Sequence, residues 1–113
     1  MLYIMPDGTI KLTRGDTARL TVSIDNHIDG TQAEYVMSAN DTLTLSMKKS
    51  IKDSTPCLQK TITGSNTFYI EPTDTRNLEF RKYKYDVQLT TSAGDVYTII
   101  EPSDFEIMEE VTC

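Results

Sequence analysis

The clearest pattern in the sequence is a strict alternation of apolar and polar residues over residues 83–90. The apolar positions share one face and the polar positions the other, as in a half-buried strand of an antiparallel sheet. Residues 92–95 then predict a short hairpin loop, in which Gly94 is free to adopt positive φ. The β-branched and aromatic residues 96–100 predict the return strand, which we expect Pro102 to end.

The remainder of the chain predicts further short strands that cover this hairpin. Clean alternation occurs at residues 17–24 and 42–48, and weaker patterns occur at residues 2–5, 10–12, 58–62, 67–70 and 104–108. Lysine and glutamine in 58–62 favour an edge strand. Residues 25–32 are predicted to be a polar loop, 49–56 a charged loop, and 34–38 either an edge strand or a connector.

One short helical element is expected in the connection that follows residue 70. Pro72, Asp74 and Thr75 favour a turn with one helical turn near residues 74–78, with Asp74 or Thr75 as its N-cap.

About seven to nine short strands separated by frequent turns predict an all-β fold, an immunoglobulin-like antiparallel β-sandwich. We expect a single domain over residues 1–113. Tyr83 or Tyr85 is expected to form the tyrosine corner of such a fold, and Val22 and Val87 stand where antibody domains have paired cysteines. The residues expected to face inward are Leu20, Val22, Ile24, Leu43, Leu45, Met47, Phe68, Ile70, Tyr85, Val87, Leu89, Phe105 and Ile107.

Composition narrows the classes of partner. The net charge is −6 and the pI about 4.6, with basic residues scattered apart from two adjacent pairs, so we expect no nucleic-acid partner. No apolar stretch is long enough for a membrane helix, and the N-terminus lacks the pattern of a signal peptide. These features predict a chain that stays in the cytosol or is built there into a larger particle.

The sequence holds little material for catalysis or metal binding. His27 is the only histidine, and neither a glycine-rich phosphate loop nor a CxxC motif occurs, so we expect no enzyme and no cofactor. Residues 25–30 begin like a calcium loop, but His27 and Val36 stand where the third and twelfth ligands belong, which favours a solvated loop. Arg14-Gly15-Asp16 is an integrin-type tripeptide, interpreted here as a turn. Cys57 and Cys113 are expected to be free thiols, with an intramolecular or intermolecular disulfide as the alternatives.

Aromatic residues provide the candidate contact surface. The chain has six tyrosines and no tryptophan, and Tyr69 and Tyr97 are predicted to point outward, with Ile99 on the same face as Tyr97. These three residues could form a patch that contacts a protein or a sugar. The alternative is that they pack under a loop or a neighbouring strand.

Five stretches carry a resemblance to a known family: residues 14–22, 40–45, 83–90, 94–102 and 105–107. Together they resemble the N-terminal immunoglobulin-like domain of phage baseplate upper proteins, which occur in phages and prophages of Gram-positive bacteria. The resemblance runs from about residue 10 to residue 111. In that family further fibre or receptor-binding segments follow the domain, whereas this sequence ends at Cys113.

The resemblance implies a non-enzymatic structural or assembly module of a phage or prophage tail. Its partners would be other tail or baseplate proteins, or copies of itself, and it would be assembled in the bacterial cytoplasm and reside in the virion. The alternative function, drawn from the exposed tyrosines, is a carbohydrate-binding sandwich on a bacterial or virion surface.

Overall fold

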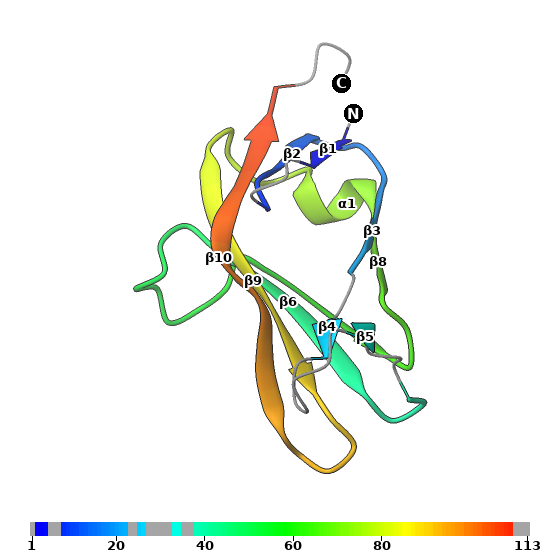
Figure 1. The fold of residues 1–113 in the computed structure, drawn as a ribbon. Coiled ribbons are helices and arrows are strands. Elements are labelled where there is room, and N and C mark those ends of the chain that lie inside the picture. The colour runs from blue at the N-terminus through cyan, green and yellow to red at the C-terminus, as the bar shows by residue number, and fades with distance from the viewer. Residues whose placement is uncertain (1, 5–7, 23–24, 27–32, 35–37, 110–113) are drawn as a thin grey trace.

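A computed structural model of the chain describes residues 2–4, 8–22, 25–26, 33–34 and 38–109 (Figure 1). These residues form ten strands and one four-residue helix. The strands are β1 (Leu2–Ile4), β2 (Ile10–Thr13), β3 (Ala18–Thr21), β4 (Asp25–Asn26), β5 (Ala33–Glu34), β6 (Thr42–Lys48), β7 (Leu58–Thr63), β8 (Thr67–Ile70), β9 (Lys82–Thr90) and β10 (Val96–Met108). Helix α1 (Pro72–Thr75) lies between β8 and β9.

The strands form an all-β sandwich with an immunoglobulin-like distribution over two main sheets. The larger sheet has the order β1-β2-β10-β9-β6-β7, and β3 pairs with β8 in the second sheet. In immunoglobulin terms β6, β9 and β10 take the places of strands C, F and G, while β3 and β8 take those of B and E. The expected purely antiparallel arrangement is wrong in one place, because β2 runs parallel to β10.

The dry layer between the sheets confirms the inward faces that alternation predicts. Every expected inward residue in the described ranges is buried, and Val22 and Val87 both lie in this core. Ile24 lies outside the described residues. The buried side chains that the inward prediction omits are Ile10, Leu12, Ala18 and Tyr83, together with the polar Asp41 and Thr75.

Strand β10 continues past Pro102, so the expected end of the return strand is wrong. Its pairing with β9 shifts register between Thr98 and Ile100 and again between Ile100 and Ser103, which is the pattern of β-bulges. Pro102 falls within the second shift and has no partner residue on β9. The absence of its backbone N–H therefore removes no hydrogen bond between β9 and β10. Residues 104–108 are therefore the second half of this strand, paired with both β9 and β2.

The cap of α1 also differs from the prediction. The helix begins one residue after Glu71, which is the N-cap, and Pro72 takes the first position, where its fixed φ is favourable. Asp74 is the third helical residue, and its carboxylate accepts a hydrogen bond from the Glu71 backbone N–H at 2.8 Å. The expected N-caps, Asp74 and Thr75, both lie inside the helix.

The polar loop predicted at residues 25–32 contains a short strand. Asp25–Asn26 (β4) pairs antiparallel with Ala33–Glu34 (β5), so Glu34 belongs to a strand and not to a connector. Residues 27–32, including His27, and residues 35–37 lie outside the described part of the chain.

Strand β7 is an edge strand, as its polar residues predict. It pairs with β6 and ends the larger sheet. Lys60 shares a face with Leu58 and Ile62, which pack against the core, and its ammonium group forms a 2.7 Å ion pair with Asp74 in α1. A charged side chain on the inner face of an edge strand disfavours the addition of another strand.

Tyr83 forms the expected tyrosine corner. Its side chain is fully buried, and its hydroxyl donates a hydrogen bond to the Glu79 carbonyl at 3.0 Å, four residues upstream. This bond fastens the connection after α1 to the start of β9. Burial raises the pKa of the Tyr83 phenol above its ordinary value.

Tyr83→Phe is expected to lower the free energy of unfolding by about 1 kcal/mol, because the Glu79 carbonyl loses its donor. Since the folded state favours the protonated phenol, its contribution is complete below pH ~10 and is lost as pH rises through the raised pKa. Denaturant unfolding at pH 7 and in the alkaline range measures both effects. The wild type should lose more stability than Tyr83→Phe above pH ~10. Tyr69→Phe, on an exposed ring, is the matched control, and equal stability of both variants at pH 7 would contradict the corner.

Candidate protein-contact surface

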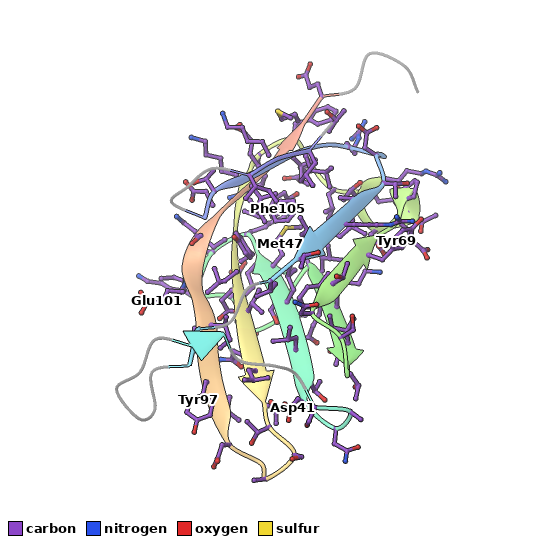
Figure 2. All side chains as sticks on the ribbon, turned by 45° about the vertical axis from the view of Figure 1, so that its right-hand side comes forward. Asp41, Met47, Tyr69, Tyr97, Glu101 and Phe105 are labelled. Carbon is purple, nitrogen blue, oxygen red and sulfur yellow. The ribbon has the colours of Figure 1, made fainter. Side chains whose placement is uncertain are left out.

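The three predicted contact residues do not form one patch. Tyr69 lies on β8 in the second sheet, and Tyr97 lies near the tip of the β9–β10 hairpin, at a different end of the molecule (Figure 2). Their side chains are 45% and 43% exposed. Ile99 sits at the first register shift of β10 and is partly buried against the core. Only Tyr97 and Ile99 belong to the same region of the surface.

The environment of Tyr69 is a local contact on the second sheet. The guanidinium carbon of Arg19 on β3 lies 5.6 Å from the centroid of the Tyr69 ring, and Arg19 and Tyr69 are register partners. This is a cation–π contact, and the ring remains partly exposed. It provides one exposed ring and no aromatic platform.

Tyr97 ends a row of apolar side chains that crosses the larger sheet. Leu43 on β6 pairs with Leu89 on β9, and Leu89 pairs with Tyr97 on β10. Residues directly opposite one another share a face, so Tyr97 lies on the core side of the sheet. Leu43 and Leu89 are buried, whereas the side chain of Tyr97 at the end of the row is partly exposed.

Among the described strands, only β9 pairs with the first half of β10. Strand β2 pairs only with Phe105–Met108, and no other described strand pairs with residues 96–104 on the side away from β9. Val96, a residue absent from the sequence-based candidates, is 57% exposed and lies on the opposite face from Tyr97. We call residues 96–98 the β10 edge. Two apolar side chains flank it, one on each face of the sheet.

A groove of about 350 Å³ lies on the outer face of the larger sheet. Outward residues of β6, β7 and β9 form its floor, and the 49–57 loop, which projects away from β3 and β8 in Figure 1, forms one wall. Ile51, Pro56 and Pro102 provide apolar lining among polar groups that include Lys48, Lys84 and Asp86. Ser46, Gln59 and Gln88 are also part of the lining, so the groove offers hydrogen-bonding groups as well as charged ones.

Two lysines face each other across the floor of this groove. Lys48 on β6 is the register partner of Lys84 on β9, and Lys84 forms an ion pair with Asp104 on its other side. Among the described residues Lys48 has no ion-pair partner. Like charges directly opposite in a sheet are destabilising. The alternation of the sequence predicts that both lysines point outward. That they lie opposite each other follows only from the register of β6 and β9.

Lys48→Glu is therefore expected to stabilise the protein by about 0.5 kcal/mol, because it replaces a like-charge pair with an opposite-charge pair. Denaturant unfolding at low and high salt measures the gain, which should shrink as salt screens it. Lys52→Glu, in the exposed loop, is the control and should change stability less. A loss of stability in Lys48→Glu would contradict the register assigned to β6 and β9.

The Arg14-Gly15-Asp16 tripeptide forms a turn, as interpreted from the sequence. The Asp16 N–H donates to the Thr13 carbonyl at 3.1 Å, and Gly15 has φ of 83°. Arg14 donates to the Leu78 carbonyl at 3.3 Å and stacks on the Phe80 ring, 4.0 Å from its centroid. The arginine is thus engaged within the chain and not extended toward solvent.

Cys57 is a free thiol that lies just before β7. Its Sγ donates to the Met47 carbonyl at 3.2 Å, and partial desolvation raises the pKa of the thiol above its ordinary value. Cys113 lies outside the described residues, so the prediction for it stays a prediction.

The described residues contain no cluster of three or more histidine, cysteine, aspartate or glutamate side chains placed to hold a metal ion. Helix α1, with four residues, is the longest helix in the described part of the chain and is too short to cross a bilayer. Comparison of this chain with protein-family models, curated proteins and solved structures finds no match.

Proposed function

We propose that this protein is a non-enzymatic structural module of a phage or prophage tail that acts through protein–protein contacts. The observation that carries the contact role is the β10 edge, which combines an open row of backbone groups with the exposed side chains of Val96 and Tyr97. Open strand edges and flanking apolar side chains are surfaces on which proteins assemble by adding a strand. The tail and virion assignment rests on the resemblance of the sequence to baseplate upper proteins.

The outer groove adds a second surface suited to the same role. Its mixture of apolar side chains, lysines and amides resembles the polar rims of protein interfaces more than an enclosed ligand site. A partner segment that carries a carboxylate would relieve the repulsion between Lys48 and Lys84.

Labelling of particles tests the proposal. Particles induced from the strain that carries the gene are purified and examined by electron microscopy with an antibody to this protein. We expect labelling at one end of the tail and detection of the chain by mass spectrometry. Complete absence of the protein from purified particles would contradict the tail assignment.

The alternative, a carbohydrate-binding sandwich, needs neighbouring aromatic rings on which a sugar can stack. Tyr69 and Tyr97, the exposed tyrosines among the described residues, lie in different sheets and at different ends of the molecule, so they do not share a platform (Figure 2). Glycan-array binding that is lost in Tyr97→Ala would favour this alternative over assembly.

A further inference from the structure

The backbone groups of the β10 edge point in directions that follow from the hairpin loop. The Thr91 N–H donates to the Asp95 carbonyl at 2.8 Å, and the Gly94 N–H donates to the Thr91 carbonyl at 2.9 Å. This is a three-residue loop in which Gly94, at φ of 91°, closes the turn. Thr91 and Asp95 therefore form a hydrogen-bonded pair.

Hydrogen-bonded and non-hydrogen-bonded pairs alternate along an antiparallel ladder. Since Thr91 and Asp95 are hydrogen-bonded, the next hydrogen-bonded pair is Leu89 with Tyr97. The N–H and C=O groups of Val96 and Thr98 consequently point away from β9, toward the open side. The β10 edge presents two donors and two acceptors at the spacing that another strand requires.

The opposite end of the larger sheet is protected in a way that the β10 edge is not. Strand β7 places Lys60 on its inner face, which disfavours strand addition. Residues 96–98 carry no charge, and the bulges that interrupt β10 begin only after Thr98. At the tip of the β9–β10 hairpin the larger sheet thus has an uncharged, regular stretch that pairs with no described strand on its outer side.

We propose that two copies of this chain associate through their β10 edges, antiparallel and about a two-fold axis that passes beside Tyr97. In this register Val96 of each copy pairs with Thr98 of the other, which satisfies all the outward backbone groups of both residues. Tyr97 lies opposite Tyr97 in the intervening non-hydrogen-bonded pair, where side chains approach most closely. The row Leu43–Leu89–Tyr97 then continues into the same row of the second copy.

The charges and backbone hydrogen-bonding groups of the β10 edge favour this register. They also allow a second copy of the chain to be the partner that pairs with this edge. An antiparallel edge is complementary to itself, so a two-fold contact needs no other partner. Shifting the pairing to place Thr98 opposite Thr98 would bring Asp95 opposite Glu101, a like-charge pair. Placing Val96 opposite Val96 would run the pairing into the hairpin loop. The register with Tyr97 at the axis avoids both, and Asp95 then faces Ile99.

This inference deepens the proposed function, since it names the partner of the β10 edge and rests on the use of that edge as a contact surface. The two are separable by experiment. Self-association is measured on the purified protein, whereas the tail assignment is measured on particles.

Disulfide trapping tests the register directly. In a Cys57→Ser, Cys113→Ser background, Tyr97→Cys places two thiols opposite each other across the axis. Paired Cα atoms in a sheet lie within the range that a disulfide spans, so mild oxidation should yield a covalent dimer. Thr98→Cys is the matched control, because its two copies are offset by two residues and point to the other face. We expect Tyr97→Cys to cross-link at least ~10-fold faster at equal concentration.

A second variant tests the backbone hydrogen bonds between the two copies without introducing a cysteine. Thr98→Pro removes an N–H that points away from β9, so the hairpin should stay folded while self-association is lost. Sedimentation of the wild type and Thr98→Pro over a range of concentrations measures the difference, with circular dichroism as the check on folding. Equal cross-linking of Tyr97→Cys and Thr98→Cys would overturn the proposal. A wild type that stays monomeric at the highest concentration reached would overturn it as well.

Discussion

Asp41→Ala is expected to lower the free energy of unfolding by about 3 kcal/mol, because a buried carboxylate with charged hydrogen bonds is removed. Asp41 is only 1% exposed. One carboxylate oxygen accepts from the Ser38 N–H and the other from the Ser92 N–H, each at 3.0 Å. Its backbone carbonyl accepts from the Gly64 N–H at 2.9 Å. The residue therefore joins three turns at the end of the sandwich where Figure 2 places it.

Denaturant unfolding followed by circular dichroism measures this loss. Asn40→Ala, at the exposed neighbouring position, is the control and should change stability by less than about 0.5 kcal/mol. Asp41→Asn should fall between the two, because the amide keeps one acceptor oxygen but turns donors toward the backbone N–H groups. An Asp41→Ala variant as stable as the wild type would contradict the role of Asp41 in holding these turns.

Phe105→Ala is expected to lower the free energy of unfolding by about 4 kcal/mol, because it opens a cavity in the centre of the core. Phe105 is fully buried, and its ring packs edge-on against Tyr85 with centroids 5.7 Å apart. It also lies where β10 pairs with both of its neighbouring strands, opposite Tyr83 on β9 and Ile10 on β2.

Phe80→Ala is the matched control for this substitution. Phe80 is an exposed phenylalanine whose main contact is the stacked Arg14, so its removal should cost about 1 kcal/mol or less. Thermal and denaturant unfolding of the two variants compare the same change of residue at a buried and an exposed position. Similar losses in both would show that the second half of β10 does not lie in the core as described.

The fold could be predicted from the sequence where one face of a strand is buried and the other is not. The alternation in β6, β8 and β9 specifies which side chains enter the core, and the observed bounds of β6 and β8 coincide with the predicted ranges. The tyrosine corner followed from the same reasoning, because the fold class places a tyrosine at the start of strand F.

Features that depend on tertiary pairing could not be predicted in this way. Pro102 was expected to end a strand, since proline removes a ladder N–H, but two bulges remove it from the ladder instead. The predicted N-cap of α1 was wrong because Asp74 is the third residue of the helix, and its carboxylate accepts a hydrogen bond from the N–H of the true N-cap, Glu71. The carboxylate of Asp41 accepts a hydrogen bond from Ser92, 51 residues away in the chain, and no local sequence pattern predicts such a distant partner.

The candidate surface was predicted in part. Tyr69 and Tyr97 are both exposed. The alternation along a strand does not tell which sheet the strand joins, and the two tyrosines lie apart in different sheets. Ile99 was assigned with Tyr97 to an exposed face, whereas the register places Tyr97 on the core side of the sheet and Ile99 is partly buried against the core. The edge at Val96 is left without a partner strand among the described residues because β2 pairs only with Phe105–Met108, and this depends on tertiary pairing.

Amide hydrogen exchange of β10, followed by NMR at low and high protein concentration, tests the assembly role of this strand most directly. At low concentration the Tyr97 amide should exchange slowly, because it bonds to β9, and the Val96 and Thr98 amides should exchange fast. At high concentration the amides of Val96 and Thr98 should become protected, while Tyr97 changes little. Fast exchange of Val96 and Thr98 at every concentration would contradict assembly through this edge.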